Sequence, residues 1–118
     1  MIIIESEKYK KAYKKIIKSN SREEERIENI KNLLISKDTL HDVLIDSLKN
    51  IYRIEQLHQN RKDYSARLNN SNNKLRLIMI PVGDYPYNTV EITDIIFDDI
   101  DDDHYKRGWY KCMDLEVC

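Results

Sequence analysis

Residues 64–79 read YSARLNNSNNKLRLIM, and this stretch decides the fold class. In residues 64–68 apolar and polar side chains alternate, which is the period of a strand with one buried face. Asparagine and serine fill residues 69–73, a composition typical of a turn, and the alternation resumes at Leu75. Two alternating segments joined by a short polar turn predict an antiparallel β-hairpin.

Two further strands are expected outside this hairpin. Residues 1–4 form a short β-branched run, MIII, which predicts a buried strand. Residues 89–97, TVEITDIIF, are strongly β-prone and predict a strand that follows the hairpin. The segment 81–88, between the hairpin and this last strand, holds both prolines and is interpreted as a loop.

Helical periods occupy the region before the hairpin. A first helix is expected to start at Glu7 with Ser6 as its N-cap, and a second to start near Arg22. The short polar break between the two favours a helical hairpin. A third, shorter helix is predicted after Asp38 or Thr39, with an apolar face that extends to Leu48.

Residues 50–63 lack a clean period and are interpreted as a loop. Helices that are grouped before hairpin-connected strands indicate an α+β fold rather than a parallel α/β sheet. The length of 118 residues suits one domain. No apolar run approaches the roughly 18 residues that cross a bilayer, so we expect a cytoplasmic protein without a membrane partner.

The charge of the chain is divided between its two parts. Residues 1–80 carry 17 Lys and Arg against 11 Asp and Glu, a net charge of +6. Residues 81–118 carry 3 against 10, a net charge of −7, so the total is −1. A near-neutral total therefore leaves a polyanion-binding surface possible.

The basic residues are densest around the hairpin. Residues 49–76 hold seven Lys and Arg against two acidic residues, a net charge of +5. Arg67 and Arg76 would project from adjacent strands, and on a shared face they would bind phosphate through paired hydrogen bonds. Aromatic Tyr64 beside them suits base stacking in single-stranded RNA. The competing interpretation is an ordinary solvated set of strand and loop residues.

Other candidate groups are weaker. His58 lies in the basic loop and is a candidate for proton transfer. The three histidines and the two cysteines, Cys112 and Cys118, do not have zinc-binding spacing. The acidic run at 98–103 does not fit a calcium loop and is interpreted as an exposed acidic linker.

Three segments together resemble the HigB-like, plasmid maintenance killer branch of the RelE/ParE toxin superfamily. They are IEQLHQNRKDYSARLN at 54–69, KLRLIM at 74–79 and VEITD at 90–94. The resemblance implies a RelE-like α+β fold: an N-terminal strand, a helical hairpin plus a short helix, then an antiparallel sheet of three to four further strands. It covers residues 1–97 as the toxin domain and leaves 98–118 as an acidic and aromatic extension of that domain.

The resemblance implies a type II toxin-antitoxin toxin. Such a toxin acts as a ribosome-dependent mRNA endoribonuclease, or mRNA interferase, in which a ribose 2′-OH attacks the adjacent phosphate, without a metal or other cofactor. The implied partners are a HigA-like helix-turn-helix antitoxin, the 70S ribosome and mRNA. The implied catalytic residues are Arg76, His58, Asp94 and His104. The implied RNA-binding residues are Arg61, Lys62, Tyr64, Arg67 and Lys74.

The chain departs from the pattern of this branch at one point. Members usually end the closing strand with Asp-Tyr-His, whereas here Ile95 and Ile96 follow Asp94. His104 would then have to reach the site from beyond the acidic run.

The alternative functions are a catalytically impaired relative that binds an antitoxin-like partner or RNA, a ParE-like gyrase poison, and an unrelated α+β interaction domain. The acidic extension is also a candidate cover for the basic face.

Overall fold

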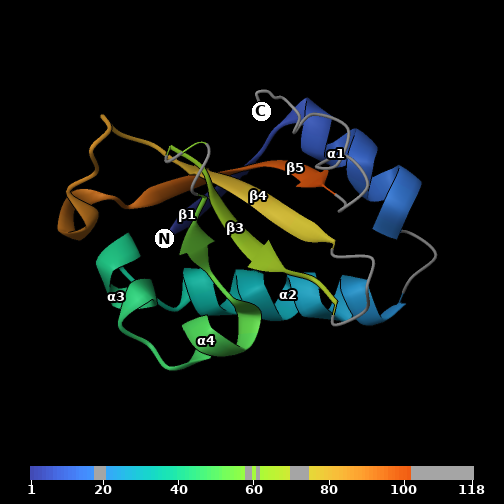
Figure 1. The fold of residues 1–118 in the computed structure, drawn as a ribbon, viewed down its shortest axis with the longest axis horizontal. Coiled ribbons are helices and arrows are strands. Elements are labelled where there is room, and N and C mark those ends of the chain that lie inside the picture. The colour runs from blue at the N-terminus through green and yellow to red at the C-terminus, as the bar shows by residue number, and fades with distance from the viewer. Residues whose placement is uncertain (18–20, 58–59, 61, 70–74, 102–118) are drawn as a thin grey trace.

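A five-stranded mixed β-sheet forms the centre of the structure, and helices pack against it (Figure 1). The computed structural model describes residues 1–17, 21–57, 60, 62–69 and 75–101. Within these residues four α-helices accompany the five strands. The predicted α+β class is therefore confirmed.

The first and last strands of the chain lie side by side in the sheet. The strands are β1 (Ile2–Glu5), β2 (Glu55–Gln56), β3 (Tyr64–Arg67), β4 (Arg76–Pro81) and β5 (Asp94–Asp101). Their spatial order is β1-β5-β4-β3-β2. The predicted hairpin is confirmed as the antiparallel pair β3 and β4, whereas β1 runs parallel to β5.

The helices precede the hairpin, as the periodicity predicts. They are α1 (Glu7–Ala12), which continues as a π-helical turn (Tyr13–Ile17), then α2 (Ser21–Ile35), α3 (Leu40–Leu44) and α4 (Leu48–Tyr52). The hydroxyl of Ser6 accepts the amide of Tyr9 at 3.0 Å and caps α1. Thr39 caps α3 in the same way, through the amide of Asp42 at 3.3 Å.

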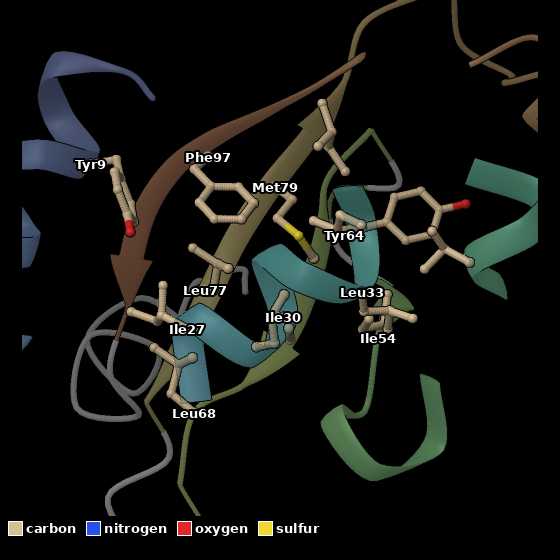
Figure 2. Packing of buried hydrophobic residues seen from close by; sticks show 14 of the residues in the cluster. Tyr9, Ile27, Ile30, Leu33, Ile54, Tyr64, Leu68, Leu77, Met79 and Phe97 are labelled. Carbon is tan, nitrogen blue, oxygen red and sulfur yellow. The ribbon is translucent and has the colours of Figure 1, made fainter. Parts of the chain in front are cut away.

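The main core lies between α2 and one face of the sheet (Figure 2). The apolar stripe of α2 consists of Ile27, Ile30, Leu33 and Leu34, all of which are buried. The strands contribute Tyr64, Ala66, Leu77, Met79, Ile95, Phe97 and Ile100. Each large side chain that is removed from water in this way stabilises the fold by roughly 1.5–3 kcal/mol.

Helix α1 covers the part of the β5 edge that β1 does not reach. The Ser6 amide donates to the carbonyl of Phe97 at 3.1 Å, and the Ser6 hydroxyl donates to the carbonyl of Asp98 at 2.9 Å. The ring of Tyr9 packs edge-on against Phe97 with centroids 5.4 Å apart. Helix α1 is thereby fixed beside the second half of β5.

Three predictions of local structure are wrong. The single helix expected after residue 38 is two helices, because the carboxylate of Asp46 accepts the amide of Leu48 at 2.8 Å and starts α4. The loop expected at 50–63 contains the end of α4 and β2. The strand expected to be buried, β1, is an edge strand in which Ile2 and Ile4 are exposed.

The closing strand is displaced from its predicted bounds of 89–97. Residues Thr89–Glu91 form a 3₁₀ turn, and β5 continues to Asp101. A bulge explains the difference: Phe97 pairs with Met79 and Asp99 pairs with Ile78, so Asp98 is an extra residue. The alternation therefore shifts by one, and four residues of the expected acidic linker belong to the sheet.

The hydroxyl of Tyr9 is the basis of a stability prediction. Among the described residues this buried oxygen has no hydrogen-bond partner, and burial together with the nearby Glu5 raises the pKa of Tyr9. Replacing Tyr9 by Phe removes an unsatisfied group and keeps the ring, so the free energy of unfolding in urea should stay unchanged or rise by about 1 kcal/mol. Tyr9→Ala should lower it by about 3–5 kcal/mol, and a large loss with Tyr9→Phe would contradict the assignment.

Candidate nucleic-acid interface

Strand alternation places two arginines on the sheet face that is opposite the α2 core. Arg67 in β3 is the register partner of Arg76 in β4, and Arg76 is the register partner of Asp101 in β5. Residues that are directly opposite one another in a sheet share a face, with Cβ atoms about 4.5–5.5 Å apart. Arg67, Arg76 and Asp101 therefore form one row across three strands. We call this set the arginine row.

The next row on this face is more enclosed. Ser65, Ile78 and Asp99 are register partners, and Ser65 and Ile78 are both buried. Lys8, from the first turn of α1, forms an ion pair with Asp99 at 3.5 Å. Helix α1 thus contributes a cation to the same face of the sheet, whereas the arginine row is only half-buried.

Within the described residues the arginine row keeps a net positive charge, because it holds two guanidinium groups against the one carboxylate of Asp101. Burial, then Arg76 and Arg53, lowers the pKa of Arg67, and only Glu55 acts in the opposite direction. Neither Arg67 nor Arg76 forms an ion pair with another described residue. A bound anion would supply the missing negative charge, and guanidinium groups bind phosphate oxygens well.

A fourth arginine supports the end of β3 from the helical side. The guanidinium of Arg26 donates to the carbonyls of Arg67 and Ile51, each at 2.7 Å, and lies 5.0 Å from the ring centre of Tyr52. These contacts hold the arginine row in place relative to α2. Arg26 and Tyr52 also line a polar pocket of about 420 Å³, which Asn69 borders.

The opposite end of β3 is aromatic. The ring of Tyr64 is only 5% exposed and lies in the core, with no free face for a base. Its neighbour Tyr87, at 6.3 Å between ring centres, donates its hydroxyl to the carbonyl of Lys62 at 2.7 Å. The side chain of Lys62 is exposed and Tyr85, edge-on to Tyr87, is 39% exposed.

Asp63 is the carboxyl group at this aromatic end. Burial and the charge of Asp98 raise its pKa, while Lys8 lowers it. The amide of Asn60 donates to its carboxylate at 3.3 Å. Asp63 precedes β3 by one residue, so its position alternates onto the same face as Arg67.

The structure separates Asp94 from Arg76. Asp94 begins β5 beside Ile2, whereas Arg76 is paired with Asp101 at the other end of that strand. Seven residues of strand correspond to about 23 Å. Asp94 and Arg76 therefore cannot contact the same phosphate, and Asp101 takes the position beside Arg76.

Four predicted site residues lie outside the described part of the chain. They are His58, Arg61, Lys74 and His104. The predictions made for them, and for the segment 102–118 as a cover, stay predictions. The sequence analysis did not find Asp101 as a member of the arginine row. It ended the last strand at residue 97, so Asp101 was not assigned to either face of the sheet. Arg53 was counted in the basic cluster, but no pattern placed it beside Arg67.

Comparison with known proteins finds no matching family model, no matching curated protein and no matching solved structure. The chain is thus defined by its own geometry, as an α+β protein with a mixed sheet and, within its described part, an arginine row of net positive charge on one face. In the described ranges, no group of three or more His, Cys, Asp or Glu is placed to hold a metal ion. None of the described helices is long and apolar enough to span a bilayer.

The arginine row leads to a prediction about stability. Like charges that are directly opposite in a sheet are destabilising, so Arg67→Met should raise the free energy of unfolding by roughly 0.2–1 kcal/mol. Urea unfolding at low salt measures it, and added salt should shrink the gain because it screens the repulsion. Lys15→Met, on an exposed helical position, is the control and should have no effect. A lower stability of Arg67→Met would show that the row is neutralised.

The raised pKa of Asp63 leads to a prediction about pH. Because the folded-state pKa lies above the unfolded one, Asp63 stabilises the fold below the unfolded pKa, and this contribution is lost as the pH rises through the folded pKa. Asp63→Asn should therefore be more stable than the parent at about pH 7 and show no advantage at about pH 3. Thermal unfolding across this range tests it, and a constant difference would contradict the shift.

Proposed function

We propose that this protein is the toxin of a type II toxin-antitoxin system and acts as a ribosome-dependent mRNA endoribonuclease. The observation that carries the proposal is the arginine row, in which Arg67 and Arg76 lie beside the carboxyl-bearing position Asp101. Two guanidinium groups suit a phosphodiester, and a neighbouring carboxylate suits removal of a proton. The order of strands and helices supports the RelE-like fold as part of this proposal.

In the proposed reaction the ribose 2′-OH attacks the adjacent phosphorus. Asp101 accepts the hydroxyl proton, and Arg67 and Arg76 stabilise the extra negative charge on the phosphate. The bond to the 5′-oxygen then breaks, an acid protonates the leaving oxygen, and the products are a 2′,3′-cyclic phosphate and a 5′-hydroxyl. His104, three residues after Asp101 in the sequence, and His58 are the candidate acids.

The corrected bounds of β5 move the proposed base from Asp94 to Asp101. The resemblance places proton-transfer groups at the end of the closing strand, and that strand ends at Asp101. His104 and Tyr105 follow Asp101 by three and four residues in the sequence and are the proposed counterparts of the histidine and tyrosine of the resemblance.

The partners of the proposed toxin are mRNA on the 70S ribosome and a HigA-like helix-turn-helix antitoxin, and its proposed location is the cytoplasm. Lys62, exposed beside the aromatic end, and Arg53, beside Arg67, extend the cationic surface along β3. Phosphate groups on either side of the scissile bond would contact these cations.

A second candidate is a relative that binds RNA without cutting it. One observation favours it: among the described residues, the acids near the arginine row are the carboxyl groups of β5 and of Glu55, and no described histidine lies there. The two candidates share the binding surface and differ only in whether Asp101 and a histidine act on the phosphate.

Induced expression should arrest growth, with transcripts cut on translating ribosomes. With the purified protein, Arg76→Ala should weaken RNA binding by about 10–100-fold, because a charge-assisted contact is lost. Asp101→Asn should retain binding and lower the cleavage rate by about 10²–10⁴-fold. The readouts are oligonucleotide affinity and cleavage of ribosome-bound mRNA.

Asp94→Asn is the matched control, since it changes the same residue type in the same strand about 23 Å away and should cleave like the parent. Loss of cleavage in Asp94→Asn but not in Asp101→Asn would overturn the proposed base. Intact transcripts together with weakened binding in Arg76→Ala would support the non-cleaving candidate, and unchanged binding in Arg76→Ala would overturn both candidates.

A further inference from the structure

The outer edge of β1 carries backbone amides that have no hydrogen-bond partner among the residues that the structure describes. On its inner side β1 bonds to β5, where the amides of Ile2 and Ser6 donate at 2.9 Å and 3.1 Å. In a parallel ladder, bonding groups alternate between the two sides of a strand, so the amides of Ile3 and Glu5 point away from β5. No hydrogen bond to either amide is present among the described residues. The strand thus offers an unpaired edge.

A groove runs along this edge between α1 and α2. Two adjoining hollows of about 410 Å³ and 390 Å³ share Glu5, Lys10 and Lys31 as lining residues. The first extends to Ile35 at the end of α2, and the second extends to Tyr13 after α1. The groove and the unpaired edge are therefore parts of one surface.

Apolar side chains border the edge on both sides of the sheet. Ile2 is 62% exposed and Ile4 is 43% exposed on the face that bears the arginine row. Ile35, from α2 on the other side, is 62% exposed. A strand laid beside β1 would project alternate side chains over both sets and remove them from water.

The lysines that line the groove favour a partner that carries negative charge. Lys10 pairs with Glu7 at 3.4 Å and Lys31 pairs with Glu5 at 2.7 Å. Lys11 and Lys14, which also line the groove, form no ion pair with a described residue. Within the described part of the chain, these two cations have no paired carboxylate.

A second copy of the chain would not bring free carboxylates to this groove from its own β1 region, because Glu5 and Glu7 are already paired.

We propose that the outer edge of β1 and the adjoining groove bind an extended, acidic and apolar segment of a partner protein, which adds a sixth strand to the sheet. Its β-branched residues would cover Ile2 and Ile4 on one face of the sheet, and on the other face its carboxylates would pair with Lys11 and Lys14. Main-chain hydrogen bonds to Ile3 and Glu5 would fix its register. This surface is independent of the arginine row and of RNA chemistry.

The test uses the full chain and a peptide of four Val-Glu repeats, blocked at both ends. Binding should slow hydrogen exchange of the Ile3 and Glu5 amides by about tenfold or more at saturation and leave the already bonded Ile2 amide unchanged. A peptide of four Val-Lys repeats should bind at least about fivefold more weakly, because it meets like charge. Equal affinity for both peptides, or no protection of Ile3 and Glu5, would overturn the proposal.

Variants separate this surface from the RNA surface. The double variant Lys11→Glu, Lys14→Glu should lose the preference for the acidic peptide. Lys15→Glu, an exposed neighbour that does not line the groove, should keep it. Arg67→Met should bind the peptide like the parent even if its RNA binding is lost. A concentration-dependent dimer that Ile4→Lys abolishes would overturn the proposal and assign the edge to a second copy.

Discussion

The alternation of side chains along β3, β4 and β5 is the constraint on which the rest of the structure depends. Because every second residue is drawn into the α2 core, the residues between them must face the other side. Tyr64, Met79 and Phe97 occupy one side as register partners, and this pairing fixes where Arg67 and Arg76 lie. The arginine row is thus positioned by apolar packing on the opposite face, and a slip of one residue would bury both guanidinium groups.

Much of the fold was predictable because its local and long-range signals agree. Ser6 and Thr39 cap helices as their residue types suggest, and the stripe of α2 follows a helical period without interruption. The hairpin was predictable for the same reason. The wrong predictions concern short elements. Helix α4 and strand β2 have five and two residues, which are too few to show a helical or strand period in the sequence.

The candidate site was only partly predictable, and the bulge at Asp98 is the physical reason. The pair Arg67 and Arg76 follows from alternation alone, but the partner from β5 depends on where the phase of that strand shifts. An aspartate-rich strand also contradicts local propensity, since Asp is depleted in sheets. Ile100 overrides that preference because its side chain fills the core. The alternation places Tyr64 on the apolar face with Ala66 and Leu68, where it is buried, so its prediction as a base-stacking residue conflicts with the strand pattern. No pattern in the sequence marked Tyr85 as exposed.

The charge division of the chain has a different meaning in three dimensions. Acidic residues of β5 are not a separate extension, since Asp99 and Asp101 lie in the sheet beside Lys8 and Arg76. The positive surface at Arg67 is therefore bounded by carboxylates rather than surrounded by further lysines. For the proposed RNA ligand, such a boundary leaves a cationic path along β3 rather than across the whole face.

The parallel pairing of β1 with β5 has a consequence for the order of folding. It joins Ile2 to Asp94, which are 92 positions apart, and it sets the last strand between the first strand and the hairpin. Loop closure over that distance is slow compared with formation of the hairpin or of α2. The pairing of β1 with β5 is consequently expected to form after that of β4 with β5, in which Arg76 and Asp101 are only 25 positions apart. During synthesis on the ribosome, the chain would carry both arginines long before it carried a finished site.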